Sequence, residues 1–384
     1  MRKLLQGMLM IVFTAGLFLT GCTAVPKEAE PAPDGKEKVQ VVTTIFPPCD
    51  FVRQIGGEYV EVTQLLKPGM EAHSYEPSPA DIIRITKSDL FLYAGGESDV
   101  WVEEVLDGND AQVTACSLLD WVDPLEEEIA EGMQVTGHHH EHEEGETDGV
   151  HLEEAEYDEH VWTSPVNAKL LVENIRDMLI SIDPERADIY EKNAAAYLEE
   201  LDALDADYRD MIGSAKRKEL VFGDRFPFLY LVRTYGLEYY AAFPGCSGET
   251  EPSAATIAFL TDKVREEGVP VVFHLELSNG RVADVIAEAA GAETAMLHSC
   301  HTLTAEEAER GETYVSLMRQ NLAALERALN ALSARDRNLV YRKYYYLQST
   351  ARMAAELGLT ERAVEGRLYR IRRKLQKQLG GEVL

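Results

Sequence analysis

Short apolar runs that alternate with helical segments set the strongest limit on the fold of this chain. Residues 39–46 and 60–66 are rich in β-branched side chains, and residues 90–96 form an apolar run that ends in two glycines. Amphipathic helical segments lie between these runs. Strands that alternate with short helices favour a parallel sheet covered on both faces. The same pattern returns at residues 219–291, so the sequence predicts two α/β lobes with parallel sheets.

A long helical pattern separates the two predicted lobes. Between residues 184 and 212 the apolar side chains recur with a spacing near 3.6, which places them on one face of a helix. They are Ile189, Tyr190, Ala194, Tyr197, Leu201, Leu204 and Tyr208. A helix over residues 184–213 is about 40 Å long and can link an N-terminal lobe (39–183) to a C-terminal lobe (214–330). Ligands often bind in the cleft between two such lobes.

The first 22 residues have the form of an export signal. Two basic residues precede an apolar run that is too short and too early for a stable membrane span. The run ends in LTGC, which resembles the lipobox at which bacterial lipoproteins are cleaved and lipidated on cysteine. Residues 23–38 are rich in proline, alanine and charge, as a flexible tether is. We therefore expect an extracytoplasmic protein anchored to the cell membrane by acyl chains on Cys22.

Four further cysteines follow the lipobox: Cys49, Cys116, Cys246 and Cys300. An oxidising compartment permits disulfides, and four cysteines allow three sets of pairs, among which the sequence does not decide. The pair Cys246–Cys300 is favoured because both residues follow apolar segments of the same half.

Two histidines of the N-terminal half occupy positions suited to metal binding. His73 follows a Pro-Gly turn and precedes two prolines that stiffen its loop. His160 precedes a Val-Trp pair whose burial would hold the ring in place. The adjacent carboxylates of Asp158 and Glu159 can orient a metal-binding ring. A structural alternative stays open for both, because a lone loop histidine is more often a solvated bystander and His160 borders the start of a helix.

Ligand-capable side chains of the C-terminal half lie where strands are predicted to end. Asp224 comes just past a strand, and Glu276 lies near the end of another. His298 and His301 follow the last strand, although such an HxxH pair is weak evidence by itself. Asp224 also has a simpler interpretation as the partner of Arg225 at the start of a helix.

Several motifs occur together and in order along the chain. They are SYEPSPAD after His73, DEHVWTSP around His160, VFGDRFPF around Asp224 and LHSCHTLT around His301. Through them residues 39–330 resemble the zinc-uptake substrate-binding lipoproteins of bacterial ABC transporters, in the group with a rigid helical linker. The resemblance implies one metal ion between two lobes, held by His residues of the first lobe and by His, Glu or Asp residues of the second. It also implies an ABC transporter permease as the partner.

The resemblance places His73 and His160 in the two ligand positions of the first lobe. The second lobe departs from the family pattern, since Gly-Asp-Arg stands where many members have His or Glu after the first strand. A further departure is His-Ser-Cys-His where many members have Asp after the last strand. Asp224 and His301 are therefore carried over as the remaining ligands. The alternates are His298, Glu276 and Cys300.

The four predicted ligands also point to a particular metal. Three imidazoles and one carboxylate suit tetrahedral Zn2+, whereas manganese and magnesium prefer carboxylate and water. A manganese-binding protein and an adhesin of the same fold stay as alternatives. Four protein ligands leave no open position for water or substrate, so we expect no enzymatic activity. The leading hypothesis is a monomer that captures zinc and delivers it to the permease.

A histidine-rich loop over residues 137–156 lies close to the predicted site in the sequence. Its histidines are His138, His139, His140, His142 and His151. The segment is acidic and has no apolar pattern, so we expect a mobile loop beside the cleft. Its histidines can bind zinc weakly and gather ions, and we expect the tight site to stay intact without Gly137 to Glu153.

The last 54 residues differ from the rest in charge and in pattern. Residues 331–384 carry 12 Lys+Arg against 5 Asp+Glu, a net charge of +7 in a chain whose total is -30. A helix over residues 350–357, a glycine turn and a basic helix from Thr360 to about Leu379 form a helix-turn-helix pattern. This small all-α segment resembles the promoter-reading region 4 of bacterial sigma factors. The resemblance implies DNA contacts from Thr360, Glu361, Arg362, Glu365 and Arg367.

Export and promoter reading conflict, because DNA and RNA polymerase are inside the membrane. Nucleic acid or RNA polymerase is therefore a partner only if residues 331–384 function in the cytoplasm. A transcription-related DNA-binding fusion protein is the alternative function.

Overall fold

The computed structural model describes residues 32–108, 113–133, 156–247 and 251–378. The predicted signal peptide with Cys22, the start of the tether and the histidine-rich loop up to residue 155 lie outside these residues. None of the helices within them is long and apolar enough to cross a membrane.

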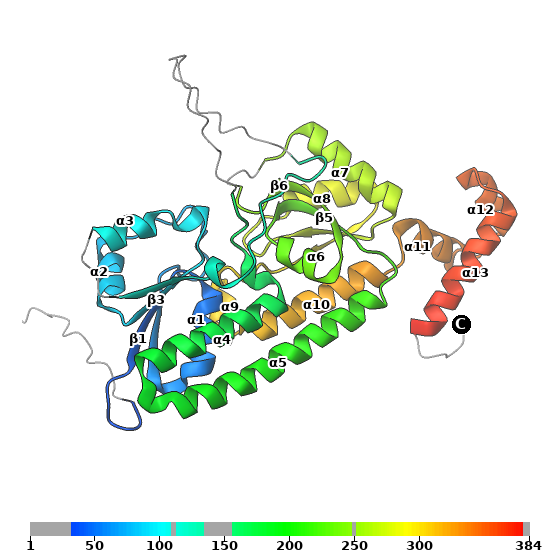
Figure 1. Ribbon diagram of the computed structural model, residues 1–384. Helices are drawn as coiled ribbons and strands as arrows, with labels where there is room; N and C mark the ends of the chain where they lie inside the picture. Colours follow the sequence, from blue (N-terminus) through cyan, green and yellow to red (C-terminus); the bar gives the residue numbers. More distant parts are fainter. Residues whose placement is uncertain (1–31, 109–112, 134–155, 248–250, 379–384) are drawn as a thin grey trace, which may run out of the picture.

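The first lobe is built on a parallel sheet with the strand order β2-β1-β3-β4 (Figure 1). Its strands are β1 (Val39–Thr43), β2 (Val60–Gln64), β3 (Leu90–Tyr93) and β4 (Thr114–Ser117). Its helices are α1 (Phe46–Gly56), α2 (Pro79–Lys87) and α3 (Trp101–Asp107). The three strands predicted for this lobe are confirmed. The sequence did not predict β4, which is four residues long and largely half-buried, so that its apolar signal is weak.

The second lobe repeats this architecture with the parallel order β6-β5-β7-β8. Its strands are β5 (Glu219–Phe226), β6 (Glu238–Pro244), β7 (Val271–His274) and β8 (Glu293–Met296). Its helices are α6 (Leu229–Tyr235), α7 (Ala254–Glu267) and α8 (Arg281–Ala290). The predicted fold class of two parallel-sheet lobes is therefore confirmed.

Strand β5 is irregular where the cleft begins. Its register against β6 shifts between Phe222 and Arg225. A Cβ atom on Gly223 would lie 2.5 Å from the backbone N and Cα of Ala283, so α8 approaches this strand too closely for any side chain. Gly223 and Asp224 therefore have no register partner on β6, and the ladder resumes at Arg225, which pairs with Phe243.

Long helices join the two lobes along one side of the molecule (Figure 1). They are α4 (Pro165–Ile182), α5 (Ala187–Gly213) and α10 (Tyr314–Asn330), and the short α9 (Ala305–Arg310) precedes the last. The apolar stripe predicted for α5 is its buried face, with only Ile189 half-buried. Tyr208 of this face donates a hydrogen bond to the carbonyl of Met318 at 2.8 Å, which fixes α5 against α10.

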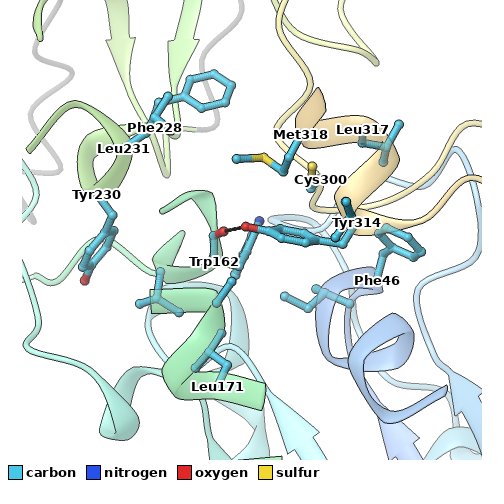
Figure 2. Close-up of a cluster of buried hydrophobic side chains, with 14 of the residues drawn as sticks. Phe46, Trp162, Leu171, Phe228, Tyr230, Leu231, Cys300, Tyr314, Leu317 and Met318 are labelled. Atoms are coloured by element: carbon cyan, nitrogen blue, oxygen red, sulfur yellow. Dashed lines mark hydrogen bonds between the residues drawn. The ribbon is translucent and has the colours of Figure 1, made fainter. Parts of the chain in front are cut away.

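Trp162 lies where the two lobes and α10 meet, and its side chain is fully buried (Figure 2). Its indole N–H donates to the carbonyl of Ser299 at 2.8 Å. The hydroxyl of Tyr314 donates to the carbonyl of Trp162 at 2.6 Å, and the backbone N–H of Tyr314 donates to Asp50 at 2.9 Å. Three distant segments of the chain are thereby tied together in one apolar core.

The C-terminal segment forms a small helical unit beyond the end of α10 (Figure 1). It consists of α11 (Ala334–Val340), the π-helical turn η6 (Tyr341–Tyr345), α12 (Thr350–Leu357) and α13 (Glu361–Gln378). Its own core holds Leu339, Met353, Ala354, Val364, Leu368 and Ile371. The predicted helix-turn-helix is confirmed, with Gly358 at φ 64° in the turn, a conformation that favours glycine.

All four cysteines of the described residues are free thiols. The favoured pair Cys246–Cys300 is therefore wrong. Cys300 is instead packed in the apolar core that also holds Trp162 (Figure 2).

We predict that the hydrogen bond between Tyr314 and Trp162 stabilises the junction of the lobes. Tyr314→Phe leaves the buried carbonyl of Trp162 without this donor, so the free energy of unfolding should fall by about 1–3 kcal/mol. Urea denaturation followed by tryptophan fluorescence measures it. Tyr369→Phe, at an exposed position on α13, is the matched control and should stay within about 0.5 kcal/mol. Equal losses in the two variants would contradict the prediction.

Candidate metal centre

Four side chains converge between the lobes: His73, Glu159, His160 and His301. One ligand atom from each residue lies within 4.8 Å of the others. The three imidazole rings are 5.3–5.6 Å apart between centroids. His73 is half-buried and the other three residues are buried. The structure thus brings together three of the four predicted ligands, with Glu159 as the carboxylate.

His73 is held in place by a serine of the first lobe. Its Nδ1 lies 2.8 Å from the hydroxyl of Ser98, which itself donates to Glu159 at 2.6 Å. Because that hydroxyl proton is directed to the carboxylate, Nδ1–H of His73 is the donor to the serine oxygen. The other ring nitrogen, Nε2, then keeps its lone pair for a metal. One hydroxyl group therefore positions two candidate ligands at once.

His160 is oriented by the carboxylate two residues before it. Asp158 accepts hydrogen bonds from the backbone N–H of His160 at 2.8 Å and from its Nδ1 at 3.0 Å. A carboxylate on one ring nitrogen fixes the tautomer and leaves Nε2 free to bind a metal. The hydroxyl of Tyr230 in turn donates to the carbonyl of Asp158 at 2.9 Å, so the second lobe supports this turn.

His301 enters the centre from the segment that follows β8. Cys300 before it has φ 61°, an uncommon conformation for a residue other than glycine, and this turns the chain back toward the first lobe. The carbonyl of His301 accepts the N–H of Phe46 at 3.1 Å. Its Nε2 is buried and has no hydrogen-bond partner among the described residues. A buried nitrogen left in this state costs about 1–3 kcal/mol, and a bound cation would satisfy it.

The protonation states of the rings favour a cation. Burial, with His160 and Arg225 nearby, lowers the pKa of His73 to about 3. Burial and the same neighbours hold the pKa of His301 well below its ordinary value. Burial also acts against protonation of His160, but the Asp158 carboxylate prevails and raises the pKa of that ring. At neutral pH His73 and His301 are therefore neutral and able to bind a metal.

Glu159 is the carboxylate that the sequence did not assign to the ligand set. The prediction treated it, with Asp158, as a group that orients His160. Asp158 takes that role, and Glu159 accepts from the N–H and hydroxyl of Ser98 beside the centre.

Asp224 lies outside the group of four, contrary to the ligand set expected from the sequence. Its two carboxylate oxygens accept the backbone N–H groups of Leu275 at 3.1 Å and of Arg225 at 2.9 Å. The irregularity in β5 directs this side chain along the sheet, toward the end of β7, where it satisfies backbone donors.

The alternates are also outside the group and engaged elsewhere. His298 accepts the N–H of Cys300 on Nδ1 at 2.8 Å, and its Nε2 faces Glu307 at 3.2 Å. Glu276 accepts from the N–H and the hydroxyl of Ser299 at 3.0 and 2.5 Å. Cys300 is buried in the core. These residues shape the segment that carries His301.

The second lobe covers the centre with an ion pair. Arg225 donates from its two terminal nitrogens to the two carboxylate oxygens of Glu71, at 3.2 and 2.9 Å. A cavity of about 30 Å³ lies beneath, lined by His73, His160 and His301 among others. This volume suits a single ion or water and is far below the several hundred Å³ of pockets for organic ligands.

The residues predicted to contact DNA divide into two groups. Thr360 accepts the N–H of Ala363 as the helix cap, Glu361 accepts from Thr350 at 2.8 Å, and Arg367 pairs with Asp336 at 2.5 Å. The other two predicted residues, Arg362 and Glu365, are exposed on α13.

Comparisons with known proteins divide the chain in two. The family "Zinc-uptake complex component A periplasmic" matches residues 41–328, and "Sigma-70, region 4" matches residues 322–375. Zinc-binding lipoprotein AdcA of Streptococcus pneumoniae serotype 4 is 35% identical over 349 residues, 88% of this chain and 65% of that protein. This chain thus spans somewhat less than two thirds of that relative's length.

Two further similarities cover the zinc-uptake part alone. High-affinity zinc uptake system protein ZnuA of Bacillus subtilis is 34% identical over 297 residues, 76% of this chain and 88% of that protein. The crystal structure of the Zn(II)-bound ZnuA-like domain of Streptococcus pneumoniae AdcA matches with a TM-score of 0.62 and 33% identity. It covers 76% of this chain and 99% of that one.

We predict that His301 is needed for tight zinc binding and Asp224 is not. His301→Ala removes a ligand and should weaken zinc binding by about 100-fold or more, beyond the loss typical of outer residues. Asp224→Asn keeps one acceptor oxygen for Leu275 and should change the affinity by about threefold at most. Competition with a chromophoric chelator measures both. The opposite order of losses would return Asp224 to the ligand set.

We predict that zinc binding near pH 7 releases no more than about two protons per ion. The two rings with lowered pKa are already neutral, so any proton that zinc displaces comes from His160 or Glu159, whose pKa values are raised. Affinity should therefore fall as the pH drops through the raised pKa values of His160 and Glu159 and level off above them. Calorimetry in buffers of different ionisation enthalpy counts the protons. Release of about three would contradict the assigned protonation states.

Proposed function

This chain belongs to the periplasmic zinc-uptake complex component A family, and we propose that it captures zinc outside the cytoplasm and delivers it to an ABC transporter permease. The observation that carries the proposal is the buried Nε2 of His301, which has no hydrogen-bond partner in the part of the chain that the structure describes and lies with His73 and His160. A bound cation would satisfy this nitrogen. Such a site suits a protein that binds an ion and later releases it.

Zinc is the ion that the chemistry of the centre supports. Three imidazoles and one carboxylate are a usual tetrahedral zinc set, whereas manganese favours more oxygen ligands. We propose His73, Glu159, His160 and His301 as the ligands. Glu159 takes the place of Asp224, which the sequence suggests as the carboxylate ligand. Four protein ligands fill a tetrahedral site, so no reaction is part of the proposed function. The match to zinc-binding relatives supports this choice over manganese or an adhesive role.

Export and anchoring complete the proposal. The basic and apolar start of the chain and the lipobox at Cys22 support secretion and lipidation, and one relative is named a lipoprotein. We propose lobes over residues 39–183 and 214–330 joined by the linking helix over 184–213. On the outer side of the membrane the segment 331–384 cannot reach promoter DNA. Arg362 and Glu365 are its candidate DNA contacts only if it functions in the cytoplasm.

The proposal predicts about one tightly bound zinc per chain after removal of loose metal. Deleting Gly137 to Glu153 should leave this ion in place and abolish only weaker binding, because the four ligands lie outside the deletion. His160→Ala in the undeleted chain should abolish tight binding. Metal analysis of the chain without residues 1–22 gives the stoichiometry. Loss of the tight ion on deletion, or its retention in His160→Ala, would overturn the assignment.

A further inference from the structure

The four proposed ligands all belong to the first lobe or are bonded to it. His73, Glu159 and His160 come from first-lobe loops. His301 comes later in the chain, but its carbonyl accepts the N–H of Phe46 at 3.1 Å and its ring lies 4.9 Å from that of Trp162. Two residues on, Leu303 accepts the N–H of Gly69 at 2.7 Å. These contacts therefore fix all four proposed ligands to the first lobe, and we refer to them together as the ligand unit.

The second sheet reaches the cavity mainly through residues that are not in this set. Those of β5, β6, β7 and the loops after them are Arg225, Pro227, Gly245, Leu275, Glu276 and Leu277, and the loop after β8 adds Ser299, Thr302 and the ligand His301. Glu276 is occupied by Ser299, and Gly245 packs where a Cβ would lie 3.4 Å from the His160 ring. Apart from His301, the second lobe thus covers the proposed ion site without contributing a ligand.

The ion pair between Arg225 and Glu71 fastens this cover to the ligand unit. Glu71 lies two residues before His73, on the same loop. The pair is bidentate, and the exposed fractions of the two side chains are 15% for Arg225 and 40% for Glu71. Bidentate, partly desolvated pairs of this type are stronger and more directional than ordinary surface ion pairs.

We propose that Arg225 and Glu71 form a clasp that holds the second lobe over the bound metal and sets the rate at which the metal leaves. The proposal rests on the proposed zinc-binding function and adds two positioning residues to it. Neither residue is a ligand, so breaking the clasp leaves the ligand set intact while the cover opens more often. Removing one partner of a partly buried charge pair acts mainly on dissociation, so release should accelerate and association change little.

The two partners carry opposite charges, which separates the clasp from a simple charge effect. If only local charge mattered, Arg225→Gln would slow the release of a cation and Glu71→Gln would accelerate it. A clasp predicts that both substitutions accelerate release, by about tenfold. The double variant should be no faster than the faster single variant, because the same interaction is lost only once. The exchange Glu71→Arg with Arg225→Glu should restore a slow rate.

The test measures zinc release into excess chromophoric chelator by stopped flow, with the chain without residues 1–22. Arg233→Gln is the matched control, because Arg233 pairs with Glu128 between the two halves of the chain but does not line the cavity. Its release rate should equal that of the wild type. Opposite shifts in Arg225→Gln and Glu71→Gln, or equal rates in all variants, would overturn the clasp and leave zinc binding intact. A wild-type chain that binds no zinc would instead overturn the proposed function.

Discussion

The hydrogen bond from the indole of Trp162 to the carbonyl of Ser299 is the contact on which the rest of the centre depends. It joins the turn that carries His160 to the segment that carries His301, although 137 residues separate its two partners. The hydroxyl of Tyr314 completes the junction by binding the carbonyl of Trp162. This junction holds the imidazoles close together, although they belong to parts of the chain that fold around different sheets.

Burial then gives the convergent side chains their chemistry. A desolvated imidazole resists protonation, so His73 and His301 keep lone pairs available, while Asp158 holds His160 in one orientation. Ser98 connects His73 to Glu159 in the same way. Each first-lobe histidine is thus fixed by a hydrogen bond on Nδ1, which leaves Nε2 available to a metal, as is usual for metal-binding histidines.

The sequence predicted much of the fold and named three of the four side chains that converge in the candidate centre, and the differences have a physical cause. The parallel strands, the linking helix and the helix-turn-helix follow from local periodicity, which the tertiary structure preserves. His73, His160 and His301 could be named from motifs. Asp224 was expected among them because it follows a strand in the right place, yet an irregularity in β5 directs it to Leu275. No local pattern reports such a shift.

What the sequence determined by itself is the set of elements and the types of side chain at their ends. Local propensity and sequence neighbours are enough to predict three features. These are the series of apolar runs, the apolar stripe of α5 and the histidines in stiff loops. Only the tertiary structure decided that Glu159 faces the centre. It also decided that His301, which follows the second sheet in the chain, is hydrogen-bonded to Phe46 of the first lobe. These choices depend on distances between segments far apart in the chain, and tertiary packing and long-range hydrogen bonds such as that of Trp162 fix such distances.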